Sequence, residues 1–114
     1  MARLIVSLIV VTISVAILCI YAEELYSDKY DNTDVMSILN NQTLQEQYYN
    51  CVIDAGPCTT DIQKFAKEHI LEAIQTNCKK CTEKQKQIVT MIKDWYEKNK
   101  PDQWHVILSI VTKM

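Results

Sequence analysis

The chain has 114 residues, of which 48% are hydrophobic and 23% are charged, and its formal net charge is −2 at pH 7. This length fits one small domain beside a leader. The slightly acidic balance leaves no basic surplus to release counterions from a nucleic acid, so we expect no nucleic-acid partner.

The first 22 residues have the layout of a secretory signal peptide. Arg3 precedes an apolar run from Leu4 to Tyr21, and the small residue Ala22 follows it. The alternative is an uncleaved anchor, because a run of this length can just span a bilayer. No cluster of lysine or arginine follows to stop transfer. We therefore expect cleavage after Ala22, a secreted domain over residues 23–114, and no stable membrane association afterwards.

Beyond the leader, residues 23–33 show no periodic pattern, and we expect an extended arm there. Apolar side chains then recur at helical spacing, and the chain holds one glycine and two prolines, too few for many tight turns. The pattern predicts an all-α domain of about five amphipathic helices, with a short one near residues 34–39 and longer ones near 42–54, 60–77, 83–98 and 102–112.

The stretch DAGPCTTDIQ, residues 54–63, marks a boundary between two of these helices. Gly56 is expected to end the first helix, and Pro57 prevents its continuation. Thr59 or Thr60 can cap the next helix, with Gln63 placed to close a capping box from Thr60.

Two later stretches contain similar signals. In CTEKQ, Thr82 is a candidate helix cap and Gln85 follows three residues later. In NKPDQW, one helix is expected to end near Asn99, and Pro101 suits the first turn of another.

The cysteines predict a disulfide framework. Cys19 lies in the leader, and Cys51, Cys58, Cys78 and Cys81 remain in the expected secreted chain. An even number of cysteines in a short exported domain is typical of disulfides. Loop entropy favours the local bridges by roughly 2–2.5 kcal/mol and a Cys58–Cys78 bridge by about 3.3 kcal/mol, so it does not choose the local pairing.

A metal site and a redox site are weaker interpretations of the same cysteines. Zinc prefers two short ligand pairs, whereas Cys51 and Cys58 stand far apart across a helix end. A redox cysteine is expected at a helix N-terminus after a strand, where the helix dipole lowers the thiol pKa. Cys78 instead follows the end of a helix, where the partial negative charge opposes the thiolate, although Lys79 and Lys80 favour it. We expect no metal and no thiol chemistry.

Catalytic machinery is also absent from the sequence pattern. His69 and His105 lie on different predicted helices, and neither belongs to a metal-binding motif. There is no serine nucleophile elbow, phosphate-binding glycine loop or paired-carboxylate motif. We expect a protein that is not an enzyme and needs no cofactor.

Asn41 has two possible roles. Asn41-Gln42-Thr43 fits the N-glycosylation acceptor pattern, which applies if the chain is exported. Asn41 also suits a helix cap. The sequence does not choose between these roles.

The apolar side chains are the remaining candidates for a function. Most of them are expected to fill a core, but helices of this length, with Met36 and Met91 available to repack, can also enclose an apolar cavity. Helical bundles commonly hold small molecules between their helices.

The cysteine spacing C-x6-C, nineteen residues, C-x2-C resembles that of the insect chemosensory protein family, of the olfactory-specific-D type. The segments KYDN, NCVIDAGPCT, CKKCTEKQK and NKPDQW match family motifs in order and spacing, from about residue 23 to residue 108. The resemblance implies a small secreted helical protein with Cys51–Cys58 and Cys78–Cys81 disulfides. It also implies a channel that binds apolar ligands such as fatty-acid derivatives and pheromone components. We expect a monomer, with a dimer as the alternative.

The resemblance also implies particular binding residues. Tyr48 aligns with a family tyrosine at the channel mouth, and Trp104 aligns with a tryptophan that lines the cavity. Four aliphatic positions match channel-lining positions, although core packing explains them equally well: Ile38, Ile70, Ile74 and Ile92.

In one respect the sequence departs from the family. Typical members continue with a Tyr-Asp-Pro turn and a further helix, whereas this sequence stops at SIVTKM. Without that helix we expect exposed apolar surface, a more open cavity, or a dimer in place of a monomer.

The expected function is therefore that of a secreted carrier of small hydrophobic ligands, for chemosensation or lipid transport. The alternative is a secreted interaction, effector or defence protein that acts through its surface and whose cavity is incidental.

Overall fold

The computed structural model describes residues 24–114, which contain five helices joined by loops and no strand. The helices are α2 (Val35–Leu39), α3 (Gln42–Val52), α4 (Asp61–Gln75), α5 (Glu83–Asn99) and α6 (Pro101–Thr112). The all-α prediction is confirmed, and every predicted helix end lies within two residues of the observed one. The expected signal peptide of residues 1–22, with Cys19, lies outside the described residues.

Side-chain caps fix where four of the helices begin. Asp34, Asn41, Thr60 and Thr82 each accept a hydrogen bond from the backbone N–H three residues later. At α5 the capping box is complete: the Thr82 Oγ1 accepts from the Gln85 N–H at 3.1 Å, and the Gln85 Oε1 accepts from the Thr82 N–H at 3.0 Å. The α6 helix instead begins with Pro101, whose missing N–H needs no partner there.

The end of α3 differs from the sequence prediction. The helix stops at Val52, and Asp54, not Gly56, takes the left-handed conformation, with a φ of 64°. The Asp54 carboxylate accepts a hydrogen bond from the Lys67 Nζ at 2.7 Å, which helps to hold this residue in place. The predicted role of Gly56 as the terminal helix residue was therefore wrong, because an aspartate tolerates the left-handed region better than most side chains do.

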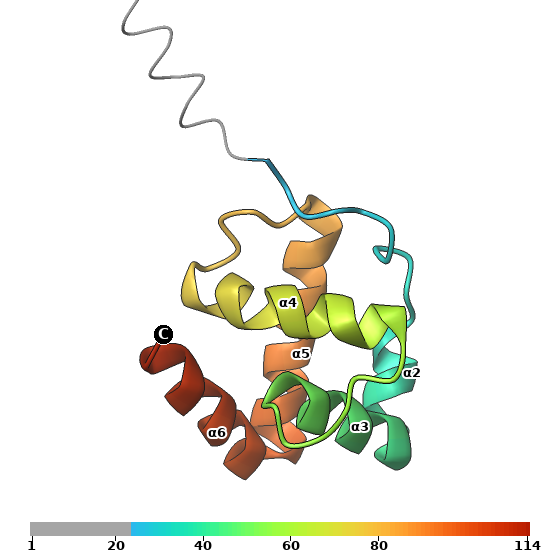
Figure 1. The fold of residues 1–114 in the computed structure, drawn as a ribbon, viewed down its shortest axis with the longest axis vertical. Helices are drawn as coiled ribbons and strands as arrows, with labels where there is room; N and C mark the ends of the chain where they lie inside the picture. The colour runs from blue at the N-terminus through green and yellow to red at the C-terminus, as the bar shows by residue number, and fades with distance from the viewer. Residues whose placement is uncertain (1–23) are drawn as a thin grey trace, which may run out of the picture.

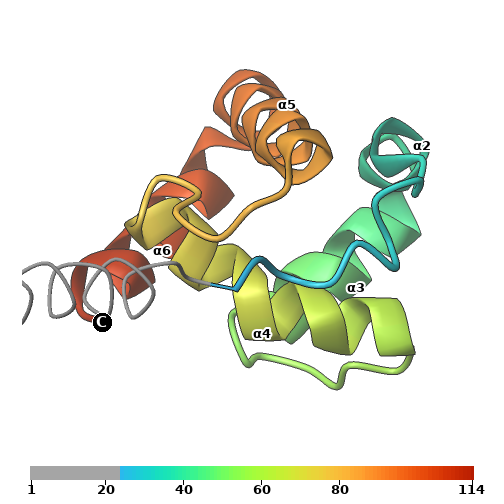
Figure 2. The ribbon, with the colours of Figure 1, turned by 90° about the horizontal axis from the view of Figure 1, so that it is seen from above.

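The helices surround a central space (Figures 1 and 2). In Figure 2, α5 and α4 lie on opposite sides, α6 connects them at one end, and α2 and α3 lie at the other end. Direct contacts between α4 and α5 are few. Residues 24–33, which we call the N-terminal arm, have no helix and pass between α4 and α5 on their way to α2.

A small core holds the ends of the helices together. The side chains of Leu39, Tyr96, Trp104 and Ile107 form one buried cluster that joins α2, α5 and α6. Half-buried apolar residues of α3 and α4 pack against it. Burying such side chains contributes about 1.5–3 kcal/mol each. The core therefore stabilises one end of the bundle while the centre stays open.

Both disulfides close local junctions. Cys51 bonds to Cys58 between α3 and α4, and Cys78 bonds to Cys81 between α4 and α5. This pairing is the one that the family resemblance implies. Neither bond joins helices that are distant in the sequence. The positions of the helices therefore depend on side-chain packing.

Candidate functional site

An apolar cavity of about 170 Å³ lies between the helices. One water molecule needs roughly 10–15 Å³ by this kind of measure, so the cavity has room for a molecule of many heavy atoms. Its wall is made largely of isoleucine, valine, leucine and aromatic side chains from all five helices and the arm. Water finds few polar partners there, and an apolar guest is the favoured occupant.

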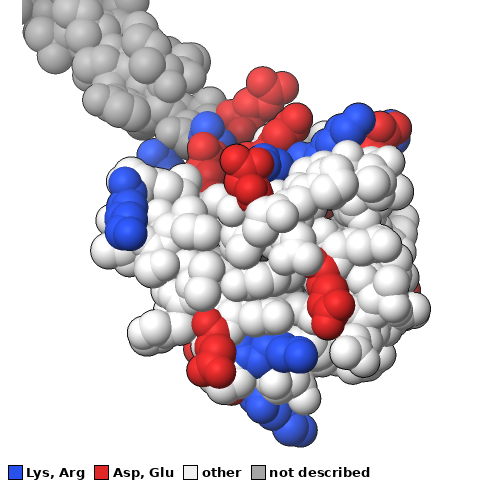
Figure 3. Space-filling model, turned by 60° about the horizontal axis from the view of Figure 1, so that its bottom comes forward, with Lys and Arg blue, Asp and Glu red and all other residues white. Residues whose placement is uncertain are grey.

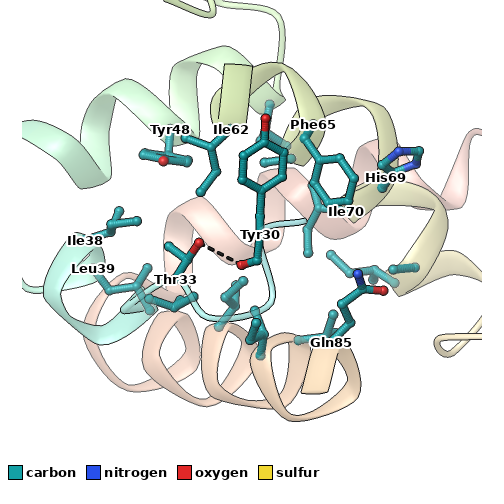
Figure 4. Close-up of a pocket in the computed structure, with 18 of the residues that line it drawn as sticks. Tyr30, Thr33, Ile38, Leu39, Tyr48, Ile62, Phe65, His69, Ile70 and Gln85 are labelled. Atoms are coloured by element: carbon teal, nitrogen blue, oxygen red, sulfur yellow. Dashed lines mark hydrogen bonds between the residues drawn. The ribbon is translucent and has the colours of Figure 1, made fainter. Parts of the chain in front are cut away.

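The structure brings the six sequence-predicted binding residues together. All of them line this cavity, although they come from five helices: Ile38 of α2, Tyr48 of α3, Ile70 and Ile74 of α4, Ile92 of α5 and Trp104 of α6. Figure 4 shows Ile38, Tyr48 and Ile70 around the open centre. Their role in ligand binding remains a prediction.

The arm supplies wall residues that the sequence reasoning missed. Tyr26 and Tyr30 line the cavity and contact aromatic side chains of α4, and Figure 4 shows Tyr30 beside Phe65. The Tyr30 ring lies 5.0 Å from the Phe65 ring, and the Tyr26 ring lies 4.4 Å from the His69 ring, measured between centroids. The presence of two tyrosines in a segment without periodicity is the signal that could have identified them, because large aromatic side chains usually pack against other residues.

The histidines occupy different environments. The His69 ring lies between Tyr26 and Phe65, at 4.4 Å and 4.6 Å, and forms part of the cavity wall. His105 is exposed on α6. Within residues 24–114, no three histidine, cysteine or acidic side chains gather as a metal site would require.

Several polar groups of the cavity wall are hydrogen-bonded to the protein itself. The Tyr26 hydroxyl donates to the Glu72 Oε1 at 2.6 Å, and the Thr33 hydroxyl donates to the Tyr30 carbonyl at 2.7 Å. The Gln85 Nε2 donates to the Asp31 Oδ1 at 2.8 Å. Since these groups are already paired, they offer a guest little directional binding.

The Tyr48 hydroxyl differs from these groups. It has no hydrogen-bond partner within the described part of the chain, and burial raises the pKa of the Tyr48 phenol. The hydroxyl is therefore protonated at neutral pH and free to donate. This wall position combines an apolar ring with one available donor.

A buried polar network lies behind the cavity wall. The Gln45 Nε2 donates to the Tyr96 hydroxyl at 2.9 Å and to the Gln103 Oε1 at 2.7 Å, which connects α3 with α5 and α6. The Gln45 Oε1 has no partner among the described residues. The Tyr96 ring lines the cavity while its hydroxyl is engaged by Gln45, so this network positions the wall.

Asn41 is a helix cap in the structure. Its Oδ1 accepts a hydrogen bond from the Leu44 N–H at 3.1 Å, and the residue is exposed. The cap interpretation is confirmed. Glycosylation uses the amide nitrogen, so the glycosylation prediction stays open beside it.

The surface shown in Figure 3 carries few charges over most of its area. Acidic and basic side chains of both signs gather along its upper rim, and a smaller mixed group lies at its lower end. Exposed apolar side chains of α6 include Val106 and Leu108. Within residues 24–114, no helix is long and apolar enough to cross a membrane.

A small α-helical fold with two local disulfides and an internal apolar cavity defines the class of helical proteins that enclose small hydrophobic molecules. The chain belongs to the insect pheromone-binding family A10/OS-D, whose family model matches residues 26–114. This confirms the family that the cysteine spacing indicates.

Known proteins agree with this assignment. The ejaculatory bulb-specific protein 3 of Drosophila melanogaster is 34% identical over 97 residues, which are 85% of this chain and 76% of the relative. A solved chemosensory protein in complex with bromo-dodecanol is 36% identical, with a TM-score of 0.71 over 77% of this chain and 87% of that one. The antennal chemosensory protein A6 of the moth Mamestra brassicae is 37% identical, with a TM-score of 0.66 over 75% of this chain and 79% of that one.

Proposed function

We propose that this protein is a secreted carrier that holds small hydrophobic ligands with long alkyl chains in the cavity between its helices. The observation that carries the proposal is the cavity of about 170 Å³, whose wall is made largely of apolar and aromatic side chains from all five helices and the arm. The similarity to a chemosensory protein solved with bromo-dodecanol supports the same ligand class.

Hydrophobic transfer is sufficient to explain such binding. Burying one methylene gains about 0.8 kcal/mol, so an alkyl chain of about twelve carbons gains roughly 10 kcal/mol. With an association cost at the low end of its range, about 4 kcal/mol, roughly 6 kcal/mol remain, which corresponds to a dissociation constant of tens of micromolar. The Tyr48 hydroxyl can add one hydrogen bond to a polar head.

Tryptophan fluorescence tests the proposal directly. Trp104 lines the cavity, whereas Trp95 lies outside it and donates its indole N–H to the Asn40 Oδ1. A Trp95→Phe variant therefore isolates the Trp104 signal. We expect dodecanol to produce a saturable change in this signal, and the absence of any saturable change across a panel of long-chain alcohols and acids would contradict the proposal.

A cavity-filling variant provides a matched test of the location. Ala73 is buried on α4 and lines the cavity, whereas Ala55 is exposed in the loop after α3. Ala73→Leu should displace the equivalent of two to three ligand methylenes and weaken dodecanol binding about 10-fold to 60-fold. Ala55→Leu should bind as the wild type does. Equal binding by both variants would place the ligand elsewhere.

Secretion is the second part of the proposal, supported by the apolar run and Ala22. Expression of the full chain in insect cells tests it. We expect a product in the medium whose first residue is Glu23. A cell-retained product that still begins at Met1 would contradict secretion. Mass spectrometry of the secreted product would give its first residue and would also show whether Asn41 carries a glycan.

A further inference from the structure

We propose that the N-terminal arm is the lid of the cavity, and that a latch formed by Asp31 with Thr82 and Gln85 keeps this lid closed. The inference rests on the proposed carrier function and adds to it the route by which a ligand enters and leaves.

The position of the arm suits a lid. Because α4 and α5 make few direct contacts, the space between them needs another cover, and the arm passes across it (Figure 2). Four arm residues line the cavity: Tyr26, Tyr30, Asp31 and Thr33. A movement of the arm alone would therefore open the cavity between α4 and α5.

The latch is a compact set of hydrogen bonds at the start of α5. The Asp31 carboxylate accepts at both oxygens: Oδ1 from the Gln85 Nε2 at 2.8 Å, and Oδ2 from the Thr82 Oγ1 at 2.7 Å. The Gln85 Nε2 also donates to the Ser27 carbonyl at 2.8 Å. Hydrogen bonds to a charged carboxylate are among the stronger ones.

The residues that hold the latch are themselves held in place. Thr82 and Gln85 form the capping box of α5, so their side chains are oriented by the helix backbone as well as by Asp31. Gln85 is buried. The latch therefore joins a non-helical segment to a fixed helix start.

A second attachment lies nearer the beginning of the arm. The Tyr26 hydroxyl donates to the Glu72 Oε1 at 2.6 Å, and the Tyr26 N–H donates to the Lys80 carbonyl at 2.9 Å. The arm also makes two local turns. The Asp31 N–H donates to the Asp28 carbonyl, and the Thr33 N–H donates to the Tyr30 carbonyl.

The arm can open at lower cost than the helices. Its turn bonds are internal and can survive the movement, whereas moving α4 or α5 would disrupt contacts with α3 or α6. Local opening of a segment that is held by a few side-chain bonds is the kind of motion that proteins undergo below the energy of global unfolding. The aromatic contacts of Tyr26 and Tyr30 would re-form when the arm closes.

Rapid-mixing kinetics with the uncharged fluorescent probe N-phenyl-1-naphthylamine tests the lid. We expect Asp31→Ala to raise both the association and the dissociation rate of the probe at least 10-fold, with the dissociation constant changed less than 3-fold. Asp31→Asn keeps one acceptor and should give intermediate rates. Asp28→Ala is the matched control, because it removes an exposed carboxylate of the same arm that accepts no side-chain hydrogen bond among residues 24–114.

Two results would overturn the inference. Rates in Asp31→Ala equal to those of Asp28→Ala would place the entry route elsewhere. A faster dissociation with an unchanged association rate would make Asp31 a ligand contact, not a latch.

Hydrogen exchange separates a failure of the lid from a failure of the carrier function. In the ligand-free protein, Asp31→Ala should speed exchange of the amides of residues 26–33 by 10-fold or more and leave the amides of α3, α4 and α5 unchanged. If the wild type binds no probe, the carrier proposal fails while this measurement still decides the latch. Unchanged exchange in the arm would contradict it.

Discussion

Gln45 shows how one side chain can position the wall of the cavity. It is only 1% exposed, and its amide bridges the Tyr96 hydroxyl of α5 and the Gln103 side chain of α6. The network holds the Tyr96 ring against the cavity, while the remaining Gln45 Oε1 has no partner within residues 24–114. A buried polar group of this kind stabilises a structure only as long as its partners remain.

Removing the Gln45 amide should therefore destabilise the protein. Gln45→Ala leaves the buried Tyr96 hydroxyl without its donor and opens a small cavity, so we expect the free energy of unfolding to fall by about 1–3 kcal/mol. Urea denaturation followed by circular dichroism measures this. Gln47→Ala, an exposed position on the same helix, should change the free energy by less than about 0.5 kcal/mol. Equal effects of the two variants would show that the network contributes nothing.

Glu72 gives the protein an acid-sensitive contact. The hydrogen bond from Tyr26, assisted by Lys80, holds the pKa of the Glu72 carboxyl below its ordinary value of 4.5. A depressed pKa in the folded state means that the contact contributes stability above pH 4.5, and that this contribution is lost as the pH falls through the lowered pKa.

The melting temperature should therefore depend on Glu72 at acid pH. Between pH 7 and pH 5 we expect little change from this group, and below pH 4.5 we expect the wild type to lose stability more steeply than Glu72→Gln. Glu68→Gln is the control, because the Glu68 carboxylate makes no hydrogen bond to the arm in the described part of the chain. Parallel pH profiles for wild type and Glu72→Gln would contradict this role.

Among the structural elements, the start of α5 has two functions. Thr82 caps the helix through its Oγ1 and at the same time donates the hydroxyl proton to Asp31 of the arm. The α4 helix is also capped by a threonine, Thr60, but the capping box predicted there is not formed, because the Gln63 Oε1 accepts from the Thr59 N–H at 2.8 Å. No contact of the Thr60 side chain with the arm is found in residues 24–114. Comparing substitutions at Thr82 and Thr60 therefore distinguishes the effect of losing a helix cap from the effect of losing the hydrogen bond to Asp31.

Substituting the two caps should separate these functions. Both Thr82→Ala and Thr60→Ala should lower the free energy of unfolding by about 0.5–2 kcal/mol through the lost cap. Only Thr82→Ala should also accelerate hydrogen exchange in residues 26–33, because it removes half of the latch. Equal exchange in the arm of both variants would contradict the double role of Thr82.

The helices were more predictable from the sequence than the arm. Capping residues and apolar periodicity are local signals, and they located every helix in residues 24–114 to within two residues. The position of the arm depends on long-range contacts, such as Asp31 with Gln85 across 54 residues, which leave no periodic signal. Gln45 was missed for a related reason, since a glutamine on an amphipathic helix is usually exposed. Asp54, not Gly56, took the left-handed conformation after α3, which a glycine near an aspartate in the sequence does not reveal.

At the scale of the whole molecule, the arrangement combines a fixed end with an open centre. The buried cluster around Trp104 holds α2, α5 and α6 together, and both disulfides remain within their own junctions. Each disulfide contributes about 2 kcal/mol through its short loop, and neither bonds a residue of α4 to a residue of α5. Such a framework can adjust its centre to guests of different length without losing the fold.

The measurement that tests the central claim most directly is a chain-length series. Straight-chain alcohols from octanol to hexadecanol should be titrated into the protein and their dissociation constants determined from Trp104 fluorescence. A guest held by apolar burial should bind about fourfold more tightly for each added methylene, until the cavity is full and the affinity levels off. Dissociation constants that do not change with chain length would contradict a carrier whose binding energy comes from the apolar cavity.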